Sequence, residues 1–150
     1  MLEYKSIEEL CRVAREKNCK LSELVLDDQA ESMELPREEL YRRMEERFAV
    51  MESAVKAGMN PELRSTSNLT GGDAAKMWVY ASSGGVCGGF VNRAMARALA
   101  VSENNAAMGK VVAAPTAGSC GILPGTVVSL ASEGRCSRQD AVMSLFTAGA

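Results

Sequence analysis

Cys120 and its setting are the most chemically suggestive feature of the chain. A short apolar run at 111–114 leads into a segment, Ala114–Gly125, that is rich in proline and glycine. Such residues interrupt regular structure, so the sequence predicts that Cys120 lies on a turn-rich loop. Its small neighbours, Ser119 and Gly121, leave room for a bulky group near the sulfur. The pattern is that of a cluster or metal ligand, or of a nucleophile; the alternative is a buried free cysteine beside a turn.

A second polar loop, 65–72, has the groups needed to bind an anion. Its candidate binding residues are three hydroxyl residues and two glycines: Ser65, Ser67, Thr70, Gly71 and Gly72. The loop directly precedes a predicted helix, and backbone N–H groups at helix N-termini favour anions. The alternative is an ordinary turn in which Thr70 or Asp73 caps the following helix.

The chain has no histidine, which limits the acid–base chemistry it can perform. By itself it cannot form a Ser-His-Asp or Cys-His site, or a zinc site with histidine ligands. A general base near neutral pH must therefore be Lys, Tyr, Cys, a carboxylate or a residue of another chain. Lys110 and Lys76 could orient an anion, although Lys76 is interpreted more simply as a surface lysine.

Composition indicates a soluble globular protein. The net charge is −2 and 47% of the residues are hydrophobic, which gives no reason to expect nucleic acid or a membrane as partner. No apolar run reaches the ~18 residues of a membrane span. The N-terminus does not resemble a secretion signal, and five cysteines form an odd set. We therefore expect a reducing, cytoplasmic location rather than a disulfide framework.

Charge and glycine divide the chain into two parts. Residues 1–64 contain 26 of the 36 charged residues, whereas residues 65–150 contain 12 of the 13 glycines. The sequence predicts one mostly α-helical domain over 1–150. Charged amphipathic helices form its first part, and a glycine-rich helical core with the active-site loops forms its second.

Hydrophobic spacing and capping signals locate the elements. The predicted helices are 7–18 (with Ser6 as its cap), 22–33, 36–58, 73–80, 90–101 and 141–150. Segment 126–132 could be helix or strand, although Pro124–Gly125 before it suits a helix start. Small residues in 90–101 predict a helix that its neighbours can approach closely. The buried stripe of the long third helix is expected to be Leu40, Met44, Phe48, Met51 and Val55.

Three segments together resemble a known family. They are Arg64–Met77 (RSTSNLTGGDAAKM), Glu103–Gly109 (ENNAAMG) and Ala114–Gly125. The chain is similar, over nearly its whole length, to the alpha chain of bacterial iron–sulfur-dependent L-serine dehydratase. The resemblance implies a helical catalytic domain that uses a 4Fe–4S cluster and not pyridoxal phosphate, with Cys120 as one cluster ligand.

The resemblance also implies roles for other residues and a partner. L-Serine would lose water and become pyruvate and ammonia, with Thr116 beside the substrate and the 65–72 loop and Lys110 on its carboxylate. The family's other cluster cysteines lie beyond the helix that starts near Ser137, so the chain is expected to be the N-terminal part of an alpha chain. A beta chain with a Ser/His motif would complete the site, and these 150 residues alone should be inactive.

Three alternatives remain at this point. One is a related iron–sulfur lyase for another small amino acid, such as a cysteine desulfidase. A second is a catalytically silent helical module that only pairs with a partner chain. The third, a pyridoxal-phosphate lyase with Lys110 as Schiff base, is disfavoured because no glycine-rich phosphate cup stands in the right relation to a lysine.

Overall fold

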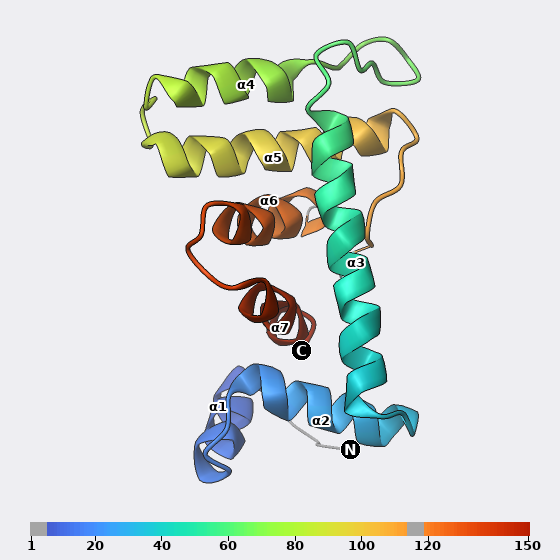
Figure 1. Cartoon of the computed structure of the whole chain (residues 1–150), viewed down its shortest axis with the longest axis vertical. Helices are drawn as coiled ribbons and strands as arrows, with labels where there is room; N and C mark the ends of the chain where they lie inside the picture. Colours follow the sequence, from blue (N-terminus) through green and yellow to red (C-terminus); the bar gives the residue numbers. More distant parts are fainter. Residues whose placement is uncertain (1–5, 114–118) are drawn as a thin grey trace. The chain divides into compact units, whose positions relative to one another are not determined.

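The computed structural model describes residues 6–113 and 119–150, and in these it contains helices and no strand (Figure 1). The mostly α-helical fold class is therefore confirmed. The helices are α1 (Ile7–Glu16), α2 (Leu21–Met33), α3 (Arg37–Gly58), α4 (Asp73–Ser82), α5 (Gly89–Ala106), α6 (Ser119–Ser132) and α7 (Arg138–Ala148).

Local signals located most helix starts correctly. The Ser6 Oγ accepts the N–H of Glu9 at 3.2 Å, which confirms the predicted cap of α1. The largest difference among the first five helices is at the end of α5. This helix continues to Ala106, beyond the predicted end at Val101, and the extension places Glu103 and Asn104 on a helix.

The start of α6 corrects the sequence prediction. Cys120 lies in the first turn of this helix and not on a turn-rich loop. The helix begins at Ser119, before Pro124–Gly125. Gly121 and Gly125 face α5, where a Cβ on either would lie within 2.9 Å of α5 atoms. These glycines serve close helix packing here instead of breaking the helix. The remainder of the predicted loop, 114–118, lies outside the described residues.

Contacts within the chain group into two compact units, and their division differs from the compositional one. The first unit consists of the residues up to Glu46 together with Arg138–Ala150. In it α2 packs against α7 and α1. Its buried core is Leu10, Ala14, Leu24, Val25, Leu26, Leu40 and Phe146. The prediction of a single domain stays a prediction.

The second unit, Arg47–Ser137, contains the end of α3 and helices α4 to α6. Helices α4 and α5 run antiparallel side by side, and α6 packs on another face of α5 (Figure 1). A Cβ added to Gly58 would lie 1.8 Å from the Ala100 carbonyl oxygen, so α3 and α5 also touch through backbone. This confirms that small residues let neighbours approach α5 closely. On α3, the predicted stripe is largely confirmed: Met44 is half-buried, and the other four residues are buried, namely Leu40, Phe48, Met51 and Val55.

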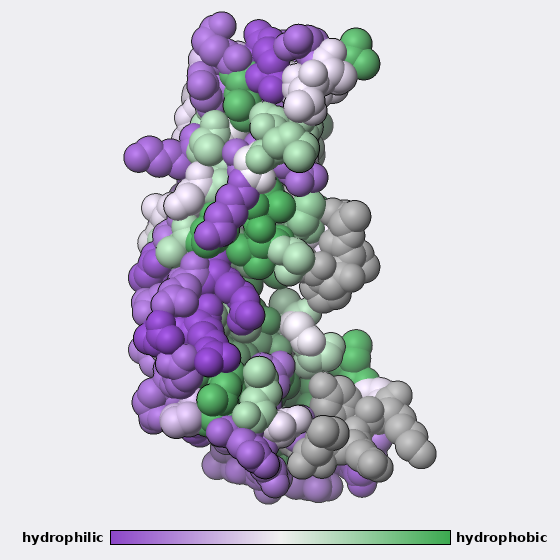
Figure 2. All heavy atoms as spheres, turned by 90° about the vertical axis from the view of Figure 1, so that its right-hand side faces the viewer, coloured by the Kyte–Doolittle hydropathy of each residue, from purple (hydrophilic) through white to green (hydrophobic). Residues whose placement is uncertain are grey.

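The charged residues lie largely on helix surfaces. On the face shown in Figure 2, hydrophilic residues predominate and hydrophobic residues form smaller groups among them. None of the helices in the described ranges combines the length and the apolar character needed to cross a bilayer.

Candidate functional site

Cys120 is the second residue of α6 and is half-buried. A Cβ on the adjacent Gly121 would lie 2.9 Å from the carbonyl oxygen of Ala98 and 3.0 Å from the Oγ of Ser102. The cysteine-bearing turn is therefore pressed against the second half of α5. Pro124 cannot donate the usual helical hydrogen bond to the Cys120 carbonyl, because proline has no N–H.

The 65–72 loop is organised around Ser65, which is buried. The Ser65 N–H donates to the Thr70 carbonyl at 2.9 Å, and the Ser65 Oγ accepts the Thr70 N–H at 3.2 Å. The Oγ atoms of Ser65 and Ser67 are 3.2 Å apart. Ser67 and Thr70 are both exposed. Ser65 thus shapes the loop, while two hydroxyls stay accessible to a ligand.

The N-terminus of α4 is capped by a carboxylate from another helix. Glu103 on α5 accepts the N–H groups of Gly72, Asp73 and Ala74 at 3.0, 2.7 and 3.1 Å. Neither Thr70 nor Asp73 makes the cap that the sequence offered as an alternative. The N–H of Gly72 is therefore already bonded, and a substrate carboxylate could use it only if Glu103 released it.

Gly71 has a separate structural reason to be glycine. Its φ is +143°, and a Cβ there would lie 2.1 Å from the carbonyl oxygen of Leu63. Lys76, on α4, is exposed and pairs with Asp73 at 2.9 Å, which favours its interpretation as a surface lysine.

The approach to the cysteine segment is held by Asn104, next to Glu103. The Asn104 Nδ2 donates to the Lys110 carbonyl at 3.0 Å, and the Asn104 carbonyl accepts the Gly109 N–H at 2.7 Å. The Lys110 side chain itself is exposed. Two residues after Asn104, the Ala106 carbonyl accepts both the N–H and the Oγ1–H of Thr66 at 3.1 Å. Both predicted site segments are therefore anchored on the last turns of α5. Thr116 lies outside the described residues.

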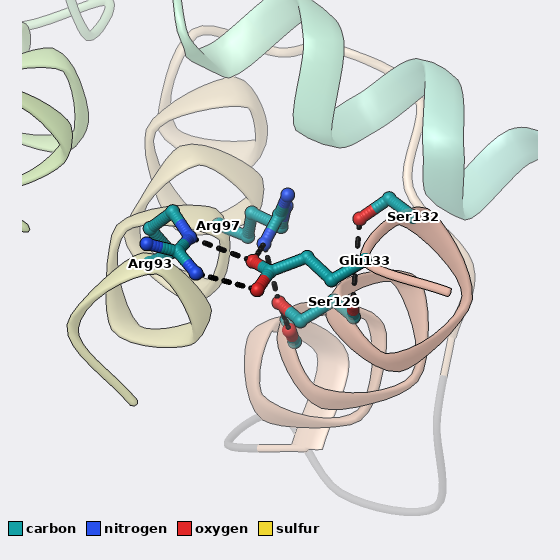
Figure 3. Close-up of polar contacts among 6 residues, drawn as sticks. Arg93, Arg97, Ser129, Ser132 and Glu133 are labelled. Atoms are coloured by element: carbon teal, nitrogen blue, oxygen red, sulfur yellow. Dashed lines mark hydrogen bonds and ion pairs between the residues drawn. The ribbon is translucent and has the colours of Figure 1, made fainter. Parts of the chain in front are cut away.

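An ionic cluster joins α5 to the end of α6 (Figure 3). Arg93 and Arg97 both point at the carboxylate of Glu133, which directly follows α6. The Arg97 Nη1 also donates to the Ser129 Oγ at 2.9 Å. Hydrogen bonding from Arg93, assisted by Arg97, lowers the pKa of Glu133 from 4.5 to about 2 despite its desolvation. The cluster helps to hold α6, and with it Cys120, against α5.

These anchoring residues were missed by sequence reasoning. Glu103 was recognised only as part of a family-like segment, and Arg93, Arg97 and Glu133 received no role. Two signals were available. The arginines are four residues apart, and so share one face of a helix rich in alanine, and extending the helical period past Val101 brings Glu103 onto α5.

The cysteines do not gather into a complete metal centre within the described residues. Cys11 and Cys19 belong to the first unit, Cys87 is exposed, and Cys120 and Cys136 are half-buried. No three His, Cys, Asp or Glu residues of the described ranges are placed to hold a metal ion together. Cys120, at a helix start that favours negative charge, fits one ligand position of a cluster.

Comparison with known proteins defines the class. The family model for the serine dehydratase alpha chain matches residues 16–150. The chain therefore belongs to the serine dehydratase alpha chain family, and the resemblance seen in its sequence is confirmed.

Two curated relatives carry this name. The chain is 36% identical over 148 residues to the probable L-serine dehydratase alpha chain of Bacillus subtilis (strain 168), a match that covers 98% of this chain and 49% of the relative. It is 34% identical over 122 residues to the L-serine dehydratase alpha chain of Peptoniphilus asaccharolyticus, covering 81% and 42%. The chain thus spans about half the length of these relatives. No solved structure matches it significantly.

Proposed function

We propose that this chain forms part of the catalytic alpha chain of an iron–sulfur L-serine dehydratase, which converts L-serine to pyruvate and ammonia. One observation carries the proposal beyond family membership. The last turns of α5 anchor the 65–72 loop through Glu103 and Ala106, and the approach to the cysteine segment through Asn104. The start of α6, with Cys120, packs on the same half of α5. One helix end thus supports every described segment to which the sequence assigns chemistry.

In this proposal the chain's own polar groups bind the substrate carboxylate. The hydroxyls of Ser67 and Thr70 are exposed and can donate hydrogen bonds, and Lys110 adds a positive charge. Thr116 is assigned to the substrate by the family resemblance alone. Holding the carboxylate fixes the direction in which the Cα proton and the hydroxyl group of serine face the remaining catalytic groups.

The proposed cofactor is a 4Fe–4S cluster, with Cys120 as one thiolate ligand and no pyridoxal phosphate. When bound, such a cluster supplies a Lewis acid that favours departure of the substrate hydroxyl. The remaining cysteine ligands are assigned to alpha-chain residues outside this sequence.

A beta chain is the proposed partner, with the cytoplasm as the location. Because this chain lacks histidine, its own candidates for the base that removes the Cα proton are Lys110, Tyr80 and the carboxylates. A histidine supplied by the beta chain meets the same need at neutral pH.

The test uses the complete enzyme, with the rest of the alpha chain and the beta chain present, purified without oxygen. We expect iron, sulfide and serine deamination. Cys120→Ser should lose the visible cluster absorbance and nearly all activity, whereas Cys11→Ser and Cys19→Ser, matched controls in the first unit, should keep both.

Each alternative has its own outcome. Equal loss in all three variants would mean that the cysteines matter only for folding. Protein without iron and sulfide would indicate a silent partner module, and a higher kcat/KM for cysteine than for serine would indicate a desulfidase. A visible absorbance band abolished by borohydride would indicate pyridoxal phosphate.

A further inference from the structure

We propose that Glu103 is a positioning residue that fixes the 65–72 loop in the shape that binds substrate. The proposal rests on the proposed function, because it takes this loop as the site of the substrate carboxylate. Glu103 would act through the backbone of the loop and not by touching the substrate.

The geometry is that of a clamp between two helices. The Glu103 Oε2 accepts the N–H of Gly72, and its Oε1 accepts the N–H groups of Asp73 and Ala74, at 2.7 to 3.1 Å. The side chain comes from α5, 31 residues after Gly72, and only 8% of the residue is exposed. An ordinary helix cap is made by the residue beside the helix and satisfies one such N–H group. Here a single buried carboxylate satisfies three.

The clamp acts on one end of the loop, and a second anchor acts on the other. Gly72 is the last loop residue, while Thr66 near the loop's start is bonded to the Ala106 carbonyl. Glu103 and Ala106 are one helical turn apart on α5. Both ends of the loop are therefore hydrogen-bonded to the same helix, α5. The exposed residues Ser67 and Thr70 lie between these two anchors in the sequence.

A purely structural cap would produce the same contacts, so the test must separate capping from positioning. Glu103→Gln keeps the size of the side chain and loses one acceptor oxygen. The orientation that keeps more bonds places the amide oxygen on Asp73 and Ala74, where the native Oε1 accepts. The amide NH2 then faces the N–H of Gly72. This variant releases the end of the loop while α4 stays capped.

In the complete enzyme, Glu103→Gln should raise KM for serine about tenfold, the size of effect expected when a hydrogen bond to a charged group is lost. The cluster absorbance should stay normal and kcat should change less than KM. Asp73→Asn is the matched control, because it removes a negative charge at the same helix start and leaves the three Glu103 bonds in place. Its KM should stay within about twofold of the wild type.

A second readout does not depend on activity. Amide hydrogen exchange in the chain should show Gly72 exchanging faster in Glu103→Gln, with Asp73 and Ala74 still protected. An unchanged KM despite a released Gly72 would overturn the positioning role. A rise in KM that is matched by a fall in kcat and in thermal stability would overturn it as well, since that is the result of a cap alone.

Failure of the proposed function looks different. If the wild-type enzyme does not deaminate serine, or if Ser67→Ala and Thr70→Ala both leave KM unchanged, the loop is not the carboxylate site, whatever the exchange pattern. If Thr70→Ala raises KM and Glu103→Gln does not, the loop binds substrate and only the role of Glu103 is wrong.

Discussion

Arg93 on α5 donates two parallel hydrogen bonds to the carboxylate of Glu133, just beyond α6: Nε to Oε1 at 2.7 Å and Nη2 to Oε2 at 2.5 Å. Arg97, one turn further along α5, adds a third bond to the same carboxylate at 3.1 Å. This is the paired geometry in which arginine binds carboxylates most strongly. The end of α6 is thus tied to α5 by charge, while glycines let its start pack directly on the same helix.

Replacing Glu133 should destabilise the chain measurably. Glu133→Gln leaves two partly buried guanidinium groups without their counter-charge, so we expect the free energy of unfolding at pH 7 to fall by about 1–3 kcal/mol. Urea unfolding measures this. Glu46→Gln removes a partner of the exposed pair with Arg42 and should cost no more than about 0.5 kcal/mol. Equal losses in both variants would show that the α5–α6 cluster contributes no more to the free energy of unfolding than an exposed ion pair does.

The same carboxylate predicts a pH dependence. Because the pKa of Glu133 is lowered from 4.5 to about 2 by Arg93 and Arg97, its contribution to stability is complete above pH 4.5 and is lost as the pH falls toward 2. The stability difference between wild type and Glu133→Gln should therefore shrink across that range. Glu39, whose pKa is also lowered to about 2 by Arg42 and Arg43, is present in both proteins and cancels. A difference that stays constant with pH would contradict the assignment.

Close packing of α6 on α5 should be intolerant of a single methyl group. In Gly125→Ala the new Cβ would lie 2.8 Å from the backbone nitrogen of Ala98 and 2.9 Å from the Ala94 carbonyl oxygen, so α6 must shift. We expect a loss of about 1–3 kcal/mol in thermal or urea unfolding. Gly149→Ala, with its nearest neighbouring atom at 3.5 Å, is the control and should be close to neutral. A neutral Gly125→Ala would mean that the two helices are not in tight contact.

Removing an exposed hydroxyl of the 65–72 loop should affect substrate binding, whereas removing the buried hydroxyl should affect stability. Thr70→Ala or Ser67→Ala removes an exposed hydroxyl and should weaken apparent serine binding roughly ten- to a hundredfold while the cluster spectrum stays intact. Ser65→Ala removes the buried acceptor of the Thr70 N–H, so it should lower stability by about 1 kcal/mol or more. Steady-state kinetics and urea unfolding distinguish these effects. A change below twofold at both Ser67 and Thr70 would leave the loop as an ordinary turn.

The sequence alone determined the helical fold and the family. The buried stripe of α3, the Ser6 cap of α1 and the small-residue face of α5 follow from spacing and side-chain size, which act within a few residues. The quoted segments were enough to identify the serine dehydratase alpha chain family. The roles of Cys120 and of the 65–72 loop remain predictions.

Tertiary structure alone decided where the site segments are anchored. Proline and glycine disfavour an isolated helix, yet α6 includes Gly121, Pro124 and Gly125, because packing on α5 requires the glycines and buries the proline. The clamp by Glu103 on Gly72 joins residues 31 positions apart, which no local periodicity encodes. Such contacts arise only when α4 and α5 pack side by side. That packing allows Glu103, at the end of α5, to hold the 65–72 loop of the candidate site.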